Sequence, residues 1–507
     1  MKKLFALMLV MILSVSMLPA ALADEIVFPL KEPVSFTGFT TIQATGGFKV
    51  SESMAWQEAV NRANLNIEMI EVPSSERVEK ANVLLGTGEY PDFFFKTILD
   101  SMTVESYGVE GVIIPLEDLI KEYAPNLTAL LNERDAWSYI TSGDGHIYSL
   151  PYLVGRQNPT VLFWLNQRWM NNLGIEKIPE NWDELYEVLK AFKEQDANGN
   201  GDPNDEIPFS GVAADPIRLM SYMDYPYIPG IKCALVDGEL TYMPTHDQFK
   251  QLLSFMSKCY SEGLIDTQMF TMDTTQFRAK GQAGDVYGFF YSGGAFQGVG
   301  RDNDEDYIGL TTFVDGTMQV GNPASPNALV ITDKCENPEV LVAWADYFYS
   351  DEGGMLTYMG IEGKTYKWLE DGTWEWILSP ELGEDVTTLR ARNTIQGVCT
   401  DPCLQPPSWF KMSPTIDADE VYLWKYRLLL AEGGFQFPAL SYTEDENDEL
   451  SIKTTDLNNY INVYIAEVIT GQKDLDATWD EYVKQMEKMG AKDIEAIYRA
   501  SYDRAAK

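Results

Sequence analysis

Histidine is almost absent from this chain of 507 residues, which contains only two, His146 and His246. Histidine is the usual general base at neutral pH and a frequent zinc ligand, so its scarcity leaves little material for either use. Neither histidine lies in a recognisable catalytic phrase, and no nucleophile-elbow, zinc-protease or phosphate-loop motif occurs in a suitable context. The sequence therefore predicts no catalytic residue.

Cysteine is also scarce, with five residues in the whole chain. The histidines lie far from the cysteines in sequence, which argues against a zinc site. An odd count leaves at least one thiol free. The short spacing of Cys399 and Cys403 around Pro402 allows a small disulfide-closed loop, although the sequence alone does not establish the pairing.

Basic residues are outnumbered by two to one, with 38 lysines and arginines against 77 acidic residues and a formal net charge of −39. Such a surface repels nucleic acid and anionic lipid, so neither is expected as a partner. It also argues against an anionic ligand, unless a local basic pocket overrides the overall charge. Solubility outside the cell is the simplest use of the charge, and recruitment of divalent cations by spare carboxylates is a second.

Long apolar runs are missing except at the start of the chain. There, Lys2 and Lys3 precede the run LFALMLVMILSVSML, and small residues follow as far as Ala23. This layout predicts a secretory signal peptide over residues 1–23, cleaved after Ala23. No cysteine lies near the cleavage point, so a lipoprotein anchor has no attachment site. We expect a secreted protein, or one at the exterior of the cell envelope.

Strands and helices alternate after the leader. The pattern predicts strands near 34–39, 66–72 and 92–95, with helices at 54–64 and 76–88, the second ending at Gly86 or Gly88. This order is typical of an α/β fold with crossover helices. Ligands of such sheets bind beyond the carboxyl ends of the strands, which directs attention to Lys96 and Thr97.

The loop DANGNGDPNDEIP, residues 196–208, places side-chain oxygens at alternate positions. Calcium takes six to eight oxygen ligands, and alternate residues of a tight loop can turn inward together. Asp196, Asn198 and Asn200 match the first three ligand positions of an EF-hand loop, and Gly201 matches its turn glycine. The closing glutamate is one place early, at Glu206. The sequence predicts a structural calcium site; a plain Asn-Gly turn is the alternative.

An ordered set of phrases resembles one family, the extracellular solute-binding proteins of ABC importers, of the sugar-binding family 1 type and its larger Gram-positive branch. The phrases that carry the resemblance are GTGEYPDFFF, GVIIPLEDLIKEYAPNL, DGHIYSLPY, WMNNLGI followed by PENWDEL, ITDKCENPEVLVAWADYFYSDEG and GIEGKTYKW. Related proteins carry a calcium loop closed by an Asp-Glu pair, which Asp205 and Glu206 reproduce, with Asp202 as a further ligand. The missing lipobox cysteine and the high acidity depart from the family.

The resemblance implies a two-lobed, periplasmic-binding-protein-like (type II) α/β fold with a crossover hinge. We expect the N-terminal lobe to comprise residues 24–153 and 311–366. The helix-rich C-terminal lobe would then comprise residues 154–310 and 367–507. The segment after Tyr152 resembles the first crossover, and the chain should return to the first lobe near Thr311–Val330.

The family resemblance also implies a carbohydrate in the cleft between the lobes. Sugars present apolar faces that stack on aromatic rings and hydroxyl rims that bond to polar groups. Some candidates lie in loops and at strand ends, where side chains project, others follow the first crossover or the phrase GIEGK, and others lie in the first lobe. The predicted ligand contacts are Glu52, Trp56, Thr97, Trp164, Arg168, Tyr225, Tyr227, Tyr287, Tyr291, Trp368 and Trp374.

The sequence thus predicts a monomeric, non-enzymatic binding protein that captures an oligosaccharide and delivers it to the permease subunits of an ABC transporter. A secreted glycoside hydrolase is one alternative, since it needs only two carboxylates held ~5–10 Å apart. The other is a ligand-sensing binding protein that signals to a membrane receptor. The sequence does not identify the glycan or separate import from sensing.

Overall fold

The computed structural model describes residues 26–43, 46–156, 158–202, 204–396, 401–416 and 418–505. The predicted signal peptide and Cys399 lie outside these residues. Within them no helix is both long and apolar enough to cross a membrane. The cysteines of the described part carry free thiols in buried positions: Cys233, Cys259, Cys335 and Cys403.

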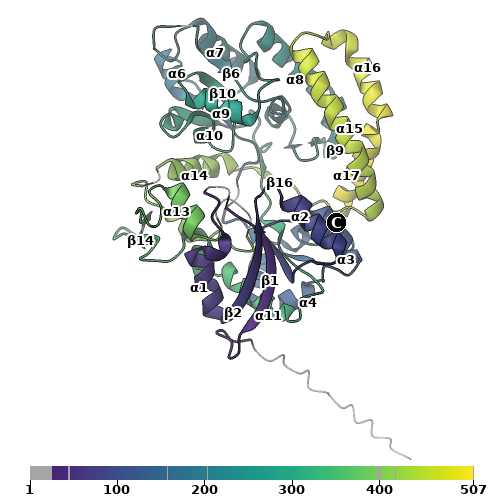
Figure 1. Cartoon of the computed structure of the whole chain (residues 1–507). Coiled ribbons are helices and arrows are strands. Elements are labelled where there is room, and N and C mark those ends of the chain that lie inside the picture. Colours follow the sequence, from purple (N-terminus) through teal and green to yellow (C-terminus); the bar gives the residue numbers. More distant parts are fainter. Residues whose placement is uncertain are drawn as a thin grey trace, which may run out of the picture.

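A five-stranded sheet forms the centre of the first lobe (Figure 1). Its strands are, in order, β2 (Leu65–Val72), β1 (Val34–Thr41), β3 (Phe93–Phe95), β13 (Ala324–Ile331) and β4 (Ser149–Leu153). The first three strands are parallel, and β13 runs antiparallel to both of its neighbours. The connecting helices are α1 (Met54–Ala63) and α2 (Arg77–Thr87), so the predicted strand-helix order is confirmed.

Alternate residues of β3 face opposite sides of this sheet. Phe93 and Phe95 pack into a large core beneath one layer of helices, whereas Phe94 and Phe39 pack into a smaller core under α2 and α3 (Ser101–Val109). The layer over the large core comprises α1, α4 (Glu117–Tyr123), α5 (Pro125–Glu133), α11 (Pro338–Asp346) and α12 (Asp351–Met359).

Local signals set the ends of the first two helices. The Ser53 hydroxyl caps α1 by accepting a hydrogen bond from the Trp56 amide at 3.2 Å. Asn64 ends α1 in the left-handed conformation, with φ 57°, which asparagine adopts more readily than most residues. Gly88, with φ 75°, ends α2, and this confirms one of the two predicted glycine stops.

A four-stranded sheet forms the centre of the second lobe. Its strands are, in order, β11 (Tyr307–Leu310), β5 (Phe163–Asn166), β10 (Tyr287–Tyr291) and β6 (Ile207–Phe209). The helices of this lobe's middle segment are α6 (Gln167–Asn172), α7 (Trp182–Glu194), α8 (Asp247–Ser261), α9 (Thr274–Gln282) and α10 (Ala295–Val299). A small antiparallel sheet adds β7 (Tyr227–Ile228), β8 (Cys233–Val236) and β9 (Glu239–Tyr242).

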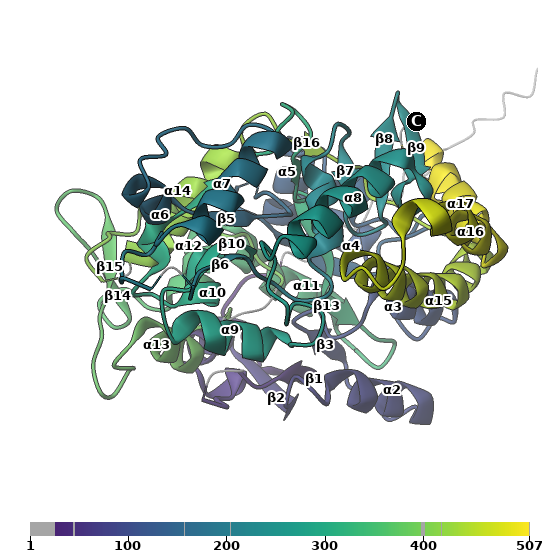
Figure 2. The same cartoon turned by 90° about the horizontal axis from the view of Figure 1, so that it is seen from above.

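The C-terminal helices form a block against the second lobe. They are α15 (Glu444–Ile469), α16 (Leu475–Lys488) and α17 (Ala491–Ala505). Ile461, Tyr482 and Ile494 from these helices belong to the same buried cluster as the residues of α8. Figure 2 shows this block at the opposite end of the molecule from the hairpin of β14 (Tyr366–Trp368) and β15 (Trp374–Trp376).

The chain passes between the lobes several times. It leaves the first sheet at the end of β4 and enters the second at β5, and it returns from β11 to β13. A third passage follows α14 (Ala418–Ala431), where β16 (Phe435–Gln436) pairs with β12 (Gln319–Val320) of the second passage. The two-lobed α/β fold is therefore confirmed, and the paired segments lie at the hinge.

The expected lobe boundary at residue 367 needs correction. The family resemblance places residues 367–507 in the second lobe. However, Trp374, Trp376, Leu389 and Trp409 are buried in the large core of the first lobe. The hairpin β14–β15, α13 (Val386–Asn393) and the short helix η7 (Pro407–Lys411) thus cover the first sheet, because their apolar side chains complete its core.

Candidate functional site

The carboxyl end of β3 is held in a strained conformation. Lys96 and Thr97, which directly follow the strand, both have left-handed backbone, with φ 78° and 48°. Such geometry costs ~1–3 kcal/mol per residue and persists where the surroundings fix it. The Lys96 amide donates to the Ala328 carbonyl at 2.8 Å, and its buried ammonium lies 3.8 Å from the buried Asp401 carboxylate. This edge of the sheet is where α/β folds bind ligands.

A groove opens next to this edge, between the lobes, and we call it the α3–α15 groove. It consists of two adjoining cavities of about 380 and 260 Å³ that share Met102, Glu105, Gly143 and Asn447 in their linings. The first lobe contributes α3 and the segment 139–149, and the second lobe contributes residues 439–448. A ligand held there would contact both lobes at once.

Hydroxyl, amide and phenol groups line the smaller cavity, including Tyr139, Tyr148 and Tyr442. Asn327, at φ 67°, fixes part of the wall: its side-chain amide donates to the Ser101 hydroxyl at 2.9 Å, and its backbone amide donates to the Ser149 hydroxyl at 2.8 Å. Aromatic faces beside planar amides and hydroxyls suit a polyhydroxylated ring.

Glu105 is a carboxylate of the groove that is partly shielded from water. Burial and the nearby charge of Asp144 raise the pKa of Glu105, although the amides of Gly143 and Asp144 oppose the rise. Asp144 is itself held by the Tyr148 hydroxyl, which donates to it at 2.6 Å. Both carboxylates accept hydrogen bonds, so they suit the hydroxyl rim of a ligand.

Five of the eleven predicted ligand contacts are core residues, so we reassign them to packing. Each has at most 1 % of its surface exposed. Trp56, for example, packs edge-on against Phe95 and Trp344, with ring centroids 5.3 and 5.6 Å apart. The residues corrected in this way are Trp56, Trp164, Tyr227, Tyr287 and Trp374.

The other six predicted contacts do not come together, and none lines the groove. They are Glu52, which is exposed beside Lys49 in η1 (Val50–Glu52), Thr97 after β3, Arg168 on α6, the half-buried Tyr225 and Tyr291 of the second lobe, and Trp368 on β14. The sequence missed Tyr139, Tyr148, Tyr442 and Asn447, because no local pattern indicates that residues some 300 positions apart meet.

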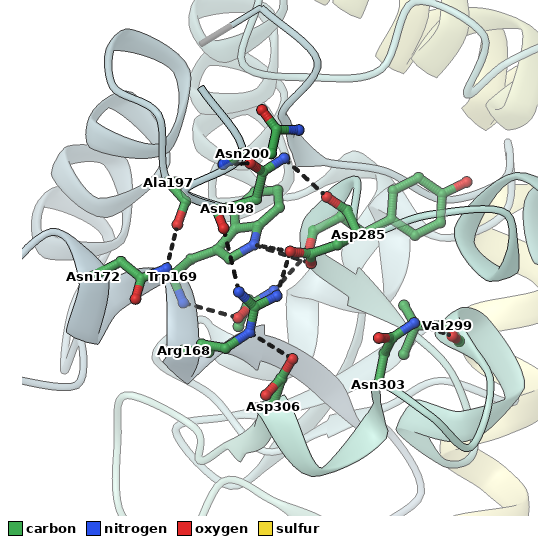
Figure 3. A network of polar contacts seen from close by, with 12 residues as sticks. Arg168, Trp169, Asn172, Ala197, Asn198, Asn200, Asp285, Val299, Asn303 and Asp306 are labelled. Atoms are coloured by element: carbon green, nitrogen blue, oxygen red, sulfur yellow. Dashed lines mark hydrogen bonds and ion pairs between the residues drawn. The ribbon is translucent and has the colours of Figure 1, made fainter. Parts of the chain in front are cut away.

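Arg168 has a structural role near the predicted calcium loop (Figure 3). Its guanidinium pairs with Asp285, donates through Nε to Asp306 at 2.7 Å, and donates through Nη1 to the Asn198 carbonyl at 3.3 Å. These contacts join α6, the loop and the segments that lead into β10 and β11. The guanidinium therefore ties the loop to the second sheet, and its predicted contact with the ligand stays a prediction.

The predicted calcium loop is folded tightly on itself. The Asn200 amide donates to the Asn198 side-chain oxygen at 2.9 Å, the Gly201 amide donates to Asp196 at 2.9 Å, and the Asp202 amide donates to the Asn200 side chain at 2.7 Å. The side-chain amide of Asn200 reaches Asp205 at 2.6 Å. These contacts hold Asp196, Asn198, Asn200 and Asp205 within one tight loop.

Two buried carboxylate oxygens of the loop, Asp196 Oδ1 and Glu206 Oε2, find no hydrogen-bond partner among the described residues. Burial raises the pKa of Glu206, and the charge of Asp205 adds to the rise. Orphaned carboxylate oxygens beside amide oxygens are the donor types that calcium prefers. However, no group of three or more His, Cys, Asp or Glu side chains in the described part is arranged to hold a metal, so the carboxylates alone form no site in this conformation.

Comparison with known proteins places the chain in a family. The model of the bacterial extracellular solute-binding protein family matches residues 50–355, more than half of the chain, and the protein belongs to this family. It is 27% identical, over 95% of this chain and 92% of the relative, to the fructooligosaccharide ABC transporter substrate-binding protein FusA of Streptococcus pneumoniae.

Solved structures agree with this fold. FusA in complex with kestose matches with a TM-score of 0.74 and 25% identity, over 93% of this chain and 99% of that one. An extracellular solute-binding protein from Bifidobacterium longum subsp. infantis matches with a TM-score of 0.78 and 19% identity, over 94% and 99%. An EF-hand mutant of FusA in complex with fructo-nystose matches with a TM-score of 0.73 and 24% identity, over 93% and 99%.

Proposed function

We propose that this protein is an exported binding protein that captures an oligosaccharide between its lobes and presents it to the permease subunits of an ABC transporter. The observation that carries the proposal is the α3–α15 groove, which both lobes line with tyrosine, amide and hydroxyl groups in a chain of the solute-binding family. The carbohydrate specificity of FusA supports the ligand class.

Binding should be non-covalent and should leave the oligosaccharide intact. A ligand that contacts both lobes is bound best when the lobes are close, so it shifts the population toward the closed form. The permease would then distinguish closed from open protein. A monomer is sufficient for this cycle, and the leader over residues 1–23 would direct the protein out of the cytoplasm.

We also propose that the loop at 196–206 binds a structural calcium ion. Asp196, Asn198, Asn200, Asp202, Asp205 and Glu206 would hold it. The two orphaned carboxylate oxygens support the proposal, because a cation would satisfy both. The ion would neutralise the charges of the loop and fix the exit of α7 against the second sheet, without taking part in ligand chemistry.

A thermal-shift screen against an oligosaccharide panel tests the ligand class. A ligand at a hundredfold excess over its Kd stabilises the folded protein by about 2.7 kcal/mol. Asn447→Ala, in the groove, should weaken binding of a hit by about fivefold or more, because one hydrogen-bonding group is lost. Asn459→Ala, on an exposed position of the same helix, is the matched control.

Two results would contradict the proposal. If no class of oligosaccharide stabilises the protein, the proposed ligand class is wrong. If the Asn447 and Asn459 variants lose affinity for a hit equally, the groove is not the binding site. Product analysis of the same incubations separates a binding protein from the glycoside hydrolase alternative, since a hydrolase would shorten the oligosaccharide.

A further inference from the structure

A further cavity, of about 240 Å³, lies where the first crossover, η7 and α14 meet. We call it the crossover pocket, and Arg156, Trp409, Phe410, Trp424 and Lys425 line it. Figure 1 shows α14 between the two lobes. Leu423 of this helix is buried in a core of the second lobe, whereas Trp424 packs against the core of the first.

Two aromatic walls of the pocket meet at a right angle. The rings of Phe410 and Trp424 have centroids 4.9 Å apart and an interplanar angle of 89°. The guanidinium of Arg156 lies 4.7 Å from the centroid of the Phe410 ring. A stacked guanidinium keeps its N–H edge free for a planar, bidentate acceptor, and a carboxylate has that geometry. The pocket therefore combines a stacking surface with an oriented donor.

The charge of the pocket is opposite to that of the whole chain. Among the described residues, its lining contains two cations and no acid, and the members besides the aromatic ones are methionine, valine and leucine. Within the described residues, neither Arg156 nor Lys425 makes an ion pair or a side-chain hydrogen bond. In a chain with twice as many acidic as basic residues, two cations without counterions around an aromatic pocket are complementary to an anion.

We propose that the crossover pocket binds the carboxylate-bearing ring of a uronic-acid residue in an acidic oligosaccharide that the protein captures between its lobes. The inference rests on the proposed function and narrows its ligand class to acidic saccharides. The sugar ring would stack on the aromatic walls, and its carboxylate would accept hydrogen bonds from Arg156 and Lys425. The local cations would thereby overcome the repulsion of the acidic surface.

The test compares trigalacturonate with its fully methyl-esterified form by isothermal titration at pH 7. The two ligands share rings and glycosidic bonds and differ in charge. We expect wild type to bind the acid more tightly than the ester. Added salt should weaken the binding of the acid and leave the binding of the ester unchanged. The double variant Arg156→Gln/Lys425→Gln should weaken binding of the acid by about 25-fold, or fivefold for each exposed cation, and change the ester by less than about twofold.

Lys411→Gln is the matched control, because Lys411 is an exposed lysine of η7 that does not line the pocket. Equal affinity of wild type for acid and ester overturns the inference, as does an equal loss in the Lys411 variant. Binding of neutral oligosaccharides alone, in the α3–α15 groove, overturns the inference and leaves the proposed function standing. Binding of no oligosaccharide at all overturns both.

Discussion

Asp401 is a completely buried carboxyl whose partner is the buried ammonium of Lys96. Burial raises its pKa to about 6, and the charge of Lys96 opposes the rise. The ordinary pKa is about 3.9, so the folded protein holds this proton more tightly than the unfolded chain. The stability gained from the protonated form is therefore complete below about pH 4 and is lost as the pH rises through 6.

The variant Asp401→Asn isolates this effect, since asparagine does not titrate. We expect the free energy of unfolding of wild type, relative to that of the variant, to fall by about 2 kcal/mol between pH 4 and pH 7. Urea unfolding at a series of pH values measures it. Loss of the ion pair with Lys96 changes the free energy of unfolding of the variant by a constant amount. Only the dependence of this free energy on pH therefore reports on the titration of Asp401. Parallel curves across this range would show that the carboxyl titrates normally.

The sequence does not determine whether a single side chain packs in a core or contacts a ligand. The sequence offers Trp56, in the first lobe, and Trp374, after the phrase GIEGK, as aromatic ligand contacts, yet both fill cores. Their chemistry suits either role, and burial depends on which distant segments cover them. For the same reason Arg168 gave no sign that its partners would be Asp285 and Asp306, more than 100 residues away.

Among the elements, the loop at 196–206 gives the sharpest expectation. Removal of calcium with a chelator should lower the stability of wild type, because calcium at a hundredfold excess over its Kd contributes about 2.7 kcal/mol. Asp196→Ala should abolish this dependence, and titration calorimetry should show one site in wild type and none in the variant. Asp480→Ala, at an exposed position of α16, should bind calcium as wild type does. Absence of calcium heat from wild type would refute the site.

The start of α15 is a second element whose stability can be tested. The Thr443 hydroxyl accepts from the Glu446 amide at 3.3 Å, and the Glu446 carboxylate accepts from the Thr443 amide at 2.8 Å, which together form a capping box. Thr443→Ala should therefore cost about 1 kcal/mol in the free energy of unfolding. Thr455→Ala, exposed in the middle of the same helix, should cost less. A larger loss at Thr455 would mean that the cap contributes little.

The order of elements was more predictable than their assignment to lobes. Hydrophobic period and glycine stops depend on neighbours in the chain, and they located β1 to β3 within a few residues. The hairpin β14–β15 was assigned to the wrong lobe because its tryptophans would be equally buried against either sheet.

At the scale of the whole molecule, the two lobes are already in contact in this structure. Gly143 of the first lobe lies so close to Tyr442 of the second that a Cβ there would be 2.4 Å from the Tyr442 carbonyl oxygen. It would also approach the Glu105 carboxylate to 2.9 Å. Heavy atoms do not approach a Cβ that closely, so any side chain at position 143 must push the lobes apart or displace one wall of the groove.

Gly143→Ala should therefore hinder closure without disturbing either core. The backbone at Gly143 is not left-handed, so alanine introduces no local strain. We expect ligand to reduce the radius of gyration of wild type in small-angle scattering, to reduce that of the variant less, and to bind the variant more weakly, because the closed form is harder to populate. Gly86→Ala, where the added Cβ meets no atom within 4 Å, should behave as wild type. If a tight ligand left the radius of gyration of wild type unchanged, closure on the ligand would be wrong, whatever the variant does.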